Sequence, residues 1–252
     1  MTHRLRAAWP YLFGALLLLG WAWGGEGAVD FSSRLLGPSL LHPFGTDEVG
    51  RDLLARTWLG GARSLTLGFA LTALHLTMGL ALALLVHGQG FLRRGLLALA
   101  DLLASIPATL LALLLLALLR PGWTSLVLAL AIGGWIPYAR LALTQLDALR
   151  QDASLWQTRL MGASAFHRFR RHLFPRLWPV LGSQASVGLG AVILVEGGLS
   201  FLGVGLPQDK ASWGTMLASG RAFLLVSPWG LLWPALGLLA VLLASGSLRR
   251  LE

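Results

Sequence analysis

The side chains that could act as acids, bases or nucleophiles are few and scattered along this chain. It contains no cysteine, so disulfides, thiolate chemistry and cysteine-ligated metal sites are excluded. Its six histidines include no pair at metal-ligand spacing on one helical face, and no nucleophile–base arrangement is evident. No G-x-x-x-x-G-K-[ST] phosphate loop is present either. We therefore expect neither an enzyme nor an ATPase, with no metal and no directly bound cofactor.

The densest group of ionisable residues lies in two glycine-led triplets, Gly45, Thr46 and Asp47 followed by Gly50, Arg51 and Asp52. This pattern predicts a turn followed by a capped helix, with Arg51 able to pair with either aspartate. An exposed pair of this kind stabilises a fold by at most about 1 kcal/mol. Two roles remain open for the segment: a folded plug that stabilises the domain, or a contact for a partner protein.

A single carboxylate, Glu196, lies well inside the apolar stretch 177–201. A charge at the centre of a membrane helix costs roughly 2.5–3.5 kcal/mol on insertion scales, so it should face protein or water. Two interpretations are open: a hydrogen bond that fixes helix packing, or a polar lining of a translocation path. Ser186 and Gly190 belong to a stripe of small residues, four apart on the same stretch, that allows close helix contact. We expect this stretch at the centre of the molecule.

Membrane helices must position these residues. The chain of 252 residues is 56% hydrophobic and only 12% charged, far from the averages of soluble proteins. A hydrocarbon core roughly 30 Å thick needs about 20 apolar residues per helix, and the chain supplies such stretches repeatedly. The fold class predicted is therefore an all-α, polytopic membrane protein. We predict six transmembrane helices, over residues 8–24, 64–86, 96–119, 123–143, 177–201 and 229–248.

Two further ionisable residues inside these spans have structural interpretations. Asp101, near one end of the third span, lies within reach of Arg93 or Arg94 in the sequence. His75 lies in the middle of the second span, where a packed, hydrogen-bonding residue is a better interpretation than a ligand.

Arginines outnumber acids in alternate connections between the spans, and this bias predicts that both termini are cytoplasmic. The expected organisation is an N-terminal transmembrane helix over 1–25, an external loop over 26–63, and a five-helix core over 64–252. That core would include a cytoplasmic loop over 145–176. No small-residue cleavage site follows the first apolar stretch, which favours a retained helix over a cleaved signal peptide.

The cytoplasmic loop has a helical pattern of its own. Its apolar residues recur at helical spacing, at Ala153, Trp156, Leu160 and Ala163. Asp152 is a plausible N-cap, Gly162 suits a helix C-terminus, and Ser164 can cap a second helix that carries Phe166. Pro175 lies near the return to the membrane. Two short amphipathic helices joined at a glycine could rest on anionic headgroups or dock in a groove of a partner protein.

This loop resembles the EAA loop of binding-protein-dependent ABC importer permeases. In that family a proline follows a glycine after thirteen residues, as Pro175 follows Gly162 here. The residues that flank this pair also match, at Ala163, Ser164, Arg171, His172 and Leu173. The name-giving Glu-Ala-Ala is replaced by Trp156, Gln157 and Thr158, so the resemblance leaves the contact chemistry of the loop open.

Three other segments are similar to the dipeptide, oligopeptide and nickel branch of these permeases, and to its second permease subunit. Residues 42–63 resemble H-x-x-G-T-D-x-x-G-R-D-x-x-x-R-x-x-x-G-A-R, residues 195–205 resemble E-x-x-L-S-F-L-G-x-G, and residues 211–217 resemble S-W-G-x-M-L. The four motifs occur in order over most of the chain, which makes the resemblance specific.

The resemblance implies a type I ABC importer permease in the inner membrane, paired with a homologous permease, two ABC ATPase subunits and an extracytoplasmic solute-binding protein. ATP would be used by the ATPases, which would push on the loop near Gly162, Trp156, Leu160 and Phe166. The 177–201 helix would lie against the partner permease. Dipeptides or oligopeptides are the expected cargo, with nickel or another small solute as the alternative. A secondary transporter, or a non-transporting scaffold or enzyme, are the rival classes.

Overall fold

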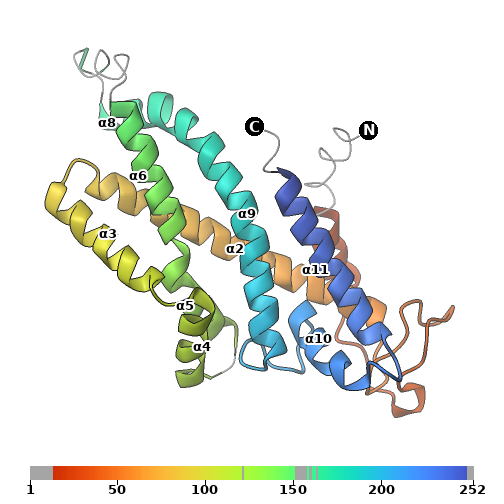
Figure 1. Ribbon diagram of the computed structural model, residues 1–252. Coiled ribbons are helices and arrows are strands. Elements are labelled where there is room, and N and C mark those ends of the chain that lie inside the picture. Colours follow the sequence, from red (N-terminus) through yellow and green to blue (C-terminus); the bar gives the residue numbers. More distant parts are fainter. Residues whose placement is uncertain (1–13, 121, 151–157, 159–160, 163, 249–252) are drawn as a thin grey trace.

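The computed structural model describes residues 14–120, 122–150, 158, 161–162 and 164–248, and this part of the chain is helical (Figure 1). A short apolar helix spans Gly14–Trp23. The longer elements are α2 (Leu53–Val86), α3 (Gly90–Ala104), α4 (Ala108–Leu118), α5 (Trp123–Gly134), α6 (Ile136–Arg150), α8 (Ala165–Arg168), α9 (Phe174–Phe201), α10 (Trp213–Gly220) and α11 (Trp229–Leu248). Three short turns complete the set: the 3-10 turns η1 (Phe31–Ser33) and η3 (Arg221–Phe223), and the π-helical turn η2 (Phe169–Leu173).

Four helical stretches are long and apolar enough to cross a membrane, namely Leu53–Val86, Trp123–Arg150, Phe166–Phe201 and Trp229–Gly246. A fifth is possible if α3 and α4, which meet at an angle of 81°, form one broken span. Of the six predicted spans, the described residues thus support four or five. Part of the first predicted span, 8–24, lies outside them, and its described part is short.

The third predicted span, 96–119, is two helices because Pro107 interrupts it. Pro107 occupies the N-cap position of α4 with an extended backbone, and α3 ends at Ala104. The proline ring disfavours helical geometry for the residue before it, so the chain bends at residues 105–107. The predicted third span therefore contains a sharp break.

The second span begins eleven residues earlier than predicted, at Leu53 instead of Ser64. Asp52 is its N-cap, and the Asp52 carboxylate accepts a hydrogen bond of 2.9 Å from the Ala55 N–H. The fourth span likewise continues past Leu143 to Arg150. Leu143 and Leu146 are buried against Leu177 and Leu181 of α9, so packing extends the helix beyond the apolar stretch.

Helices α2 and α9 cross at the centre of the molecule and pack against most of the other helices (Figure 1). Glycines permit the close crossings. A Cβ on Gly68 of α2 would lie 2.5 Å from Ile193 of α9, and one on Gly79 would lie 2.6 Å from the Tyr138 side chain of α6. Small residues at crossings are the usual means of helix association in membranes. The predicted central position of 177–201 agrees with this arrangement.

Candidate functional site at the two ends of the bundle

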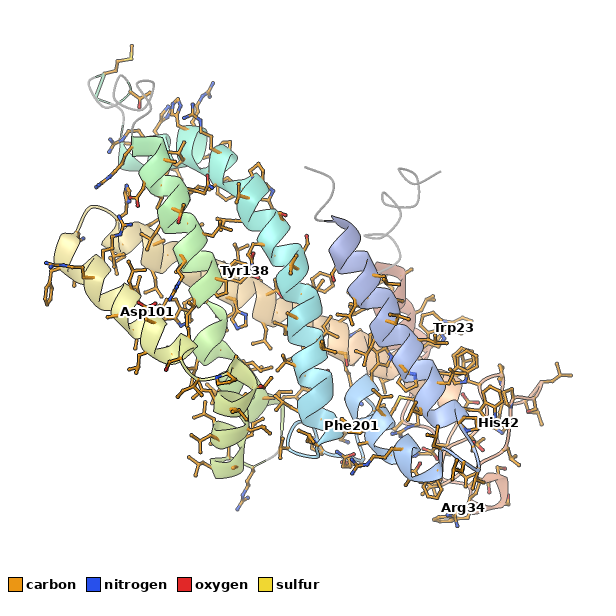
Figure 2. The ribbon with its side chains drawn as sticks, viewed as in Figure 1. Trp23, Arg34, His42, Asp101, Tyr138 and Phe201 are labelled. Atoms are coloured by element: carbon orange, nitrogen blue, oxygen red, sulfur yellow. The ribbon has the colours of Figure 1, made fainter. Side chains whose placement is uncertain are left out.

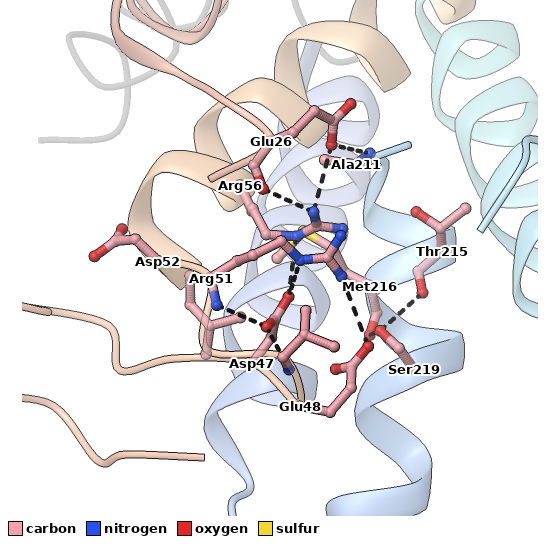
Figure 3. A network of polar contacts seen from close by, with 12 residues as sticks. Glu26, Asp47, Glu48, Arg51, Asp52, Arg56, Ala211, Thr215, Met216 and Ser219 are labelled. Atoms are coloured by element: carbon pink, nitrogen blue, oxygen red, sulfur yellow. Dashed lines mark hydrogen bonds and ion pairs between the residues drawn. The ribbon is translucent and has the colours of Figure 1, made fainter. Parts of the chain in front are cut away.

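A network of charged side chains ties together one end of the molecule (Figure 3). Arg56, on the first turns of α2, donates to the Glu26 carbonyl oxygen over 2.9 Å and lies 3.5 Å from the Asp47 carboxylate. Arg63, seven residues along the same helix, pairs with the Glu26 carboxylate and donates to the Ala211 carbonyl oxygen over 3.1 Å. The Ala211 N–H in turn donates to Glu26 over 2.9 Å. The network therefore joins the segment after the first helix, α2, and the approach to α10.

The Asp47 turn supplies the other half of this network. Gly45 and Gly50 adopt left-handed backbones, with φ of +83° and +81°. The Asp47 carboxylate accepts hydrogen bonds from the Val49 N–H over 3.0 Å and the Arg51 N–H over 2.8 Å. It also pairs with the Arg51 guanidinium over 2.7 Å. The predicted turn and capped helix are present, and of the two aspartates it is Asp47 that pairs with Arg51.

The expectation of an exposed, weak pair in this segment is wrong. The side chains of the paired Arg51 and Asp47 are only 14% and 6% exposed, and that of Arg56 beside Asp47 is 2% exposed. Breaking a buried pair from one side typically costs about 3–5 kcal/mol, because a charge is left uncompensated. Arg56 and Arg63 escaped notice because the helix was expected to begin at Ser64. Their spacing of seven residues, two helical turns, was the signal that could have placed both on one face.

Thr46 and Asp52 fasten the loop to the start of α2. The Thr46 hydroxyl accepts the Leu36 N–H over 2.9 Å, and Thr46 forms an isolated bridge with Asp52. The second carboxylate oxygen of Asp52 lies 2.8 Å from Nδ1 of His42. Earlier in the same loop, Asp30 caps η1, and hydrogen bonds from Ser32 and Ser33 lower the pKa of its carboxyl group. Each polar residue of the two triplets thus has a partner within the loop or on α2.

Glu196 is fully buried at the crossing of α2 and α9. The Ser64 hydroxyl of α2 donates to one of its carboxylate oxygens over 3.0 Å, and the Ser200 hydroxyl donates to the other over 2.9 Å. Ser200 also accepts the Leu206 N–H over 3.2 Å, from the loop that leads to α10. These contacts are the ones that a packing role requires, and none of them opens to solvent.

Other small residues of α9 also face inward. A Cβ on Gly190 would lie 2.4 Å from the Ser245 hydroxyl of α11, so glycine permits this crossing. The Ser186 hydroxyl bonds to the Gly182 carbonyl oxygen of its own helix over 3.1 Å. Gly198, by contrast, is exposed and has no atom near its Cβ position. At Gly190 the stripe of small residues therefore packs against α11. At Gly198 it lies on a surface that no other described segment covers.

The opposite end carries ion pairs that differ from the expected ones. Arg93 forms a two-pronged pair with Asp147 of α6, at 2.9 and 2.6 Å, and Asp101 pairs with Arg140. The predicted partners of Asp101, Arg93 or Arg94, are wrong because α6 lies alongside α3 and presents Arg140 to it. His87, at the end of α2, lies 4.0 Å from Asp147. Burial, and then the charge of Arg150, lowers the pKa of His87.

The interpretation of His75 as a packed residue agrees with its geometry. Its side chain is buried on α2, and Nε2 lies 3.1 Å from the Leu130 carbonyl oxygen of α5. Among the residues that the structure describes, no group of three or more His, Asp or Glu side chains could hold a metal ion.

The loop predicted over 145–176 lies at this second end. Its first residues, up to Arg150, belong to α6, and the described part resumes with Thr158, Met161 and Gly162. Gly162 has a left-handed backbone, with φ of +75°. Ser164 precedes α8, and its hydroxyl accepts the His167 N–H over 3.2 Å, as an N-cap does. Phe166 is 71% exposed, and His172 lies in the π-helical turn. The predictions for Asp152, Trp156, Leu160 and Ala163 concern residues outside the described part of the chain.

The second loop helix is continuous with α9, whereas the sequence predicted a separate short helix. Pro175 lies in the first turn of α9 and cannot donate a hydrogen bond to the carbonyl four residues before it. The chain widens at this point into the π-helical turn, where the Phe174 N–H bonds to the Phe169 carbonyl oxygen. Such turns absorb an irregularity without ending the helix. One helical path therefore runs from Ala165 through Pro175 to Phe201.

These elements define an all-helical membrane protein with the fold of an ABC importer permease. A chain of the inward-facing MetNI methionine ABC transporter superposes with a TM-score of 0.60 at 19% identity, over 79% of this chain and 96% of that one. The family model for the binding-protein-dependent transport system inner membrane component matches residues 75–251. The chain belongs to this family.

Several characterised or named permeases are similar over most of the chain. The probable D,D-dipeptide transport system permease protein DdpC of Escherichia coli K12 is 36% identical over 213 residues, 84% of this chain and 72% of the relative. The nickel transport system permease protein NikC of the same strain is 32% identical over 220 residues, 86% and 79% of the two chains. The oligopeptide permease protein OppC of Bacillus subtilis 168 is 33% identical over 203 residues, 79% and 65%.

The chain is thus a multi-pass inner-membrane permease of a binding-protein-dependent ABC importer, within the group that includes peptide and nickel permeases. It is a transport component and not an enzyme, and it binds no cofactor, because ATP is used by the ATPase subunit. Membership of the family implies an ATPase and a binding protein as partners.

Proposed function

We propose that this chain is the second permease of a heterodimeric, type I importer that carries dipeptides or oligopeptides. In this proposal it has six transmembrane helices with both termini in the cytoplasm, one homologous permease beside it, and two ATPases below. The Glu26 network then faces outward, where the binding protein delivers cargo. The similarity to DdpC and OppC supports a peptide cargo.

The continuous helix from Ala165 to Phe201 is the observation that carries the mechanism. It starts at the exposed loop near Gly162 and ends close to Glu196, at the other end of the molecule (Figure 1). A push on the loop is therefore transmitted along one helix to the α2 crossing. ATP-driven closure of the ATPases would move this helix as a rigid body and turn the cavity between the permeases outward.

The loop would meet the ATPase mainly through apolar anchors. The family's Glu-Ala-Ala is absent, and Phe166 is an exposed aromatic residue beside the Ser164 cap. Trp156 and Leu160 would supply the other anchors, with Asp152 and Ala163 shaping the first helix. Apolar side chains at helical spacing are the usual way in which a helix docks in a groove.

We assign Glu196, Gly190 and Ser186 to helix packing and not to the lining of the path. Both Glu196 oxygens accept hydroxyl hydrogen bonds within this chain, and Gly190 lies against α11. The two triplets at 45–52 form a stabilising plug, because their polar groups are satisfied internally. Contact between the plug and the binding protein is the alternative role.

A cysteine at Ser164 tests the coupling role directly, because the chain has no other cysteine. In proteoliposomes that contain the whole importer, Ser164→Cys should crosslink to an ATPase subunit, and uptake of a labelled dipeptide should require ATP and the binding protein. A matched cysteine at Asp209, on the opposite connection, should give no ATPase crosslink. Uptake driven by an ion gradient without ATP would instead support a secondary transporter.

Nickel is the second candidate cargo, and the similarity to NikC favours it. The same proteoliposomes decide between the two cargoes. ATP-dependent accumulation of labelled nickel, insensitive to an excess of dipeptide, would replace the peptide proposal while leaving the permease role intact.

A further inference from the structure

The loop between η1 and α2 carries two fully exposed leucines at its tip. Ser39 and His42 close a tight turn there: the Ser39 N–H donates to the His42 carbonyl oxygen over 2.9 Å, and the His42 N–H donates to the Ser39 hydroxyl over 3.1 Å. Leu40 and Leu41, between them, are among the most exposed apolar side chains of the described chain. The closed turn therefore presents both leucines outward, and no other segment of the described chain covers them.

Contacts with α11 fix the depth of this turn. The Phe44 ring stacks on Trp233 at 3.9 Å between ring centroids, and the Trp233 Nε1–H donates to the Phe44 carbonyl oxygen over 3.1 Å. On the other side of the turn, a Cβ on Gly37 would lie 3.6 Å from Nε1 of Trp229. The leucine turn is therefore held beside the first two turns of α11.

The start of α11 marks the boundary of the hydrocarbon. Its 20 residues rise about 30 Å at roughly 1.5 Å per residue, which equals the usual hydrocarbon thickness. Trp229 lies at its first position and Trp233 one turn inside. Tryptophans gather at this level because their rings favour the headgroup region. Phe44 therefore reaches about one turn below the membrane surface, and the leucine turn lies next to it.

A second apolar segment lies on the same side. Leu225 and Val226, directly before α11, are also strongly exposed. Leu35, at the base of the loop, lines the same small pocket as Phe223 and Ser227, so the base of the loop lies beside this segment. The loop extends sideways, beyond α11 and away from the bundle, in Figure 1, and His42 lies at this margin in Figure 2.

We propose that Leu40 and Leu41, with Leu225 and Val226, form a lipid-facing anchor that inserts into the headgroup and acyl boundary of the adjacent leaflet. Under the orientation proposed above, this is the outer leaflet. The anchor would hold the plug and its Glu26 network at a fixed height above the bilayer. Apolar side chains at this depth enter the membrane by about 5–10 Å in interfacial segments. Lipid is the occupant that the geometry favours, because the turn is fixed at the tryptophan level and its tip carries no charge.

A single cysteine can locate the tip. Leu41→Cys, labelled with an environment-sensitive fluorophore in the whole importer, is reconstituted in phosphatidylcholine vesicles with nitroxide-bearing lipids. We expect blue-shifted emission, strong quenching by a nitroxide near the headgroup, weaker quenching by one near the bilayer centre, and several-fold weaker quenching by aqueous iodide than at the control site. The control is Asp209→Cys, an exposed charged position on the connection between α9 and α10.

Two results would overturn this inference. Iodide quenching at position 41 equal to that at position 209 would place the tip in water. The label could instead be shielded from iodide only when the binding protein or the partner permease is added, with no quenching by the nitroxide lipids. That result would assign the tip to a protein contact. Neither result depends on the cargo or on ATP-driven uptake, so the anchor and the transport proposal fail separately.

Discussion

The two ends of this permease differ in how deeply they bury their charged residues. At the network end, Asp47 and Arg56 are buried and joined to Glu26 and Arg63 by paired, short contacts. At the loop end, Arg170 and Arg171 are exposed around Phe166. Regions with few buried contacts open at low free energy, whereas buried networks open only with the fold. The comparison indicates that the network end is the more rigid of the two, and the loop end is the one that we propose an ATPase contacts.

The strongest test of this contrast is removal of Arg56. Arg56→Ala removes the most deeply buried cation of the network, while Asp47 keeps Arg51 and Glu26 keeps Arg63. The variant should destabilise the protein by about 3 kcal/mol, the low end of the range for a broken buried pair. Thermal unfolding in detergent measures the loss as a clear drop in midpoint. Arg34→Ala, which removes an exposed arginine bonded to the Glu48 carbonyl oxygen, should change the midpoint little. Equal, small shifts in both variants would show that the network end is no more rigid than the surface.

Glu196 tests whether the rigid region extends into the membrane. Glu196→Leu leaves the Ser64 and Ser200 hydroxyls without their acceptor. The free energy of unfolding should fall by about 1–3 kcal/mol. Glu196→Gln retains a carbonyl acceptor and should cost less. The thermal midpoint and peptide uptake are measured together for both variants. A Gln variant of normal stability with altered uptake would contradict the packing role and place Glu196 on the path.

Substitutions at Gly162 test the proposed coupling role of the loop end. A Cβ there meets no neighbouring atom, but φ is +75°, so a β-branched side chain is strained by roughly 1–2 kcal/mol through the backbone alone. Gly162→Val should lower uptake per ATP hydrolysed while the complex still copurifies. Gly162→Asn is the matched control, since asparagine tolerates this region. Unchanged coupling in the valine variant would remove the loop from the mechanism.

The smallest expected effect concerns pH at His87. Burial and Arg150 lower its pKa below the usual 6.5 in the folded protein. Between that lowered value and about 6.5 the unfolded chain binds more protons, so stability is lost as pH falls through this window. The thermal midpoint should decline as the pH falls below about 6.5, and it should decline less steeply in His87→Gln. If the thermal midpoint depends on pH identically in the unaltered protein and in His87→Gln, His87 does not contribute to this pH dependence.

Local patterns were read correctly where a few neighbouring residues decide the outcome. The turn and capped helix predicted at 45–52 are present, Ser164 caps its helix, and Gly162 adopts a left-handed backbone, because capping and turn chemistry depend on adjacent backbone groups.

Features set by distant segments could not be derived in the same way. The partner of Asp101 depends on how α6 lies against α3, and the burial of Asp47 depends on Glu26 and on α10. Hydropathy alone also placed the start of α2 at Ser64, since the charged turns before it looked like loop. Pro175 was expected near a boundary, and tertiary packing instead carries the helix through it.

Helix α2 has a mechanical consequence of its own. Its 34 residues span about 51 Å, well beyond a hydrocarbon core of about 30 Å. It is anchored at its beginning by Arg56 and Arg63, and its other end leads directly to His87 and the Arg93–Asp147 pair. Such a rod acts as a lever arm: a swing of about 10° about one end displaces the other by roughly 9 Å over that length. A modest rotation of α2 at one end of the molecule would therefore produce a large displacement at the other end.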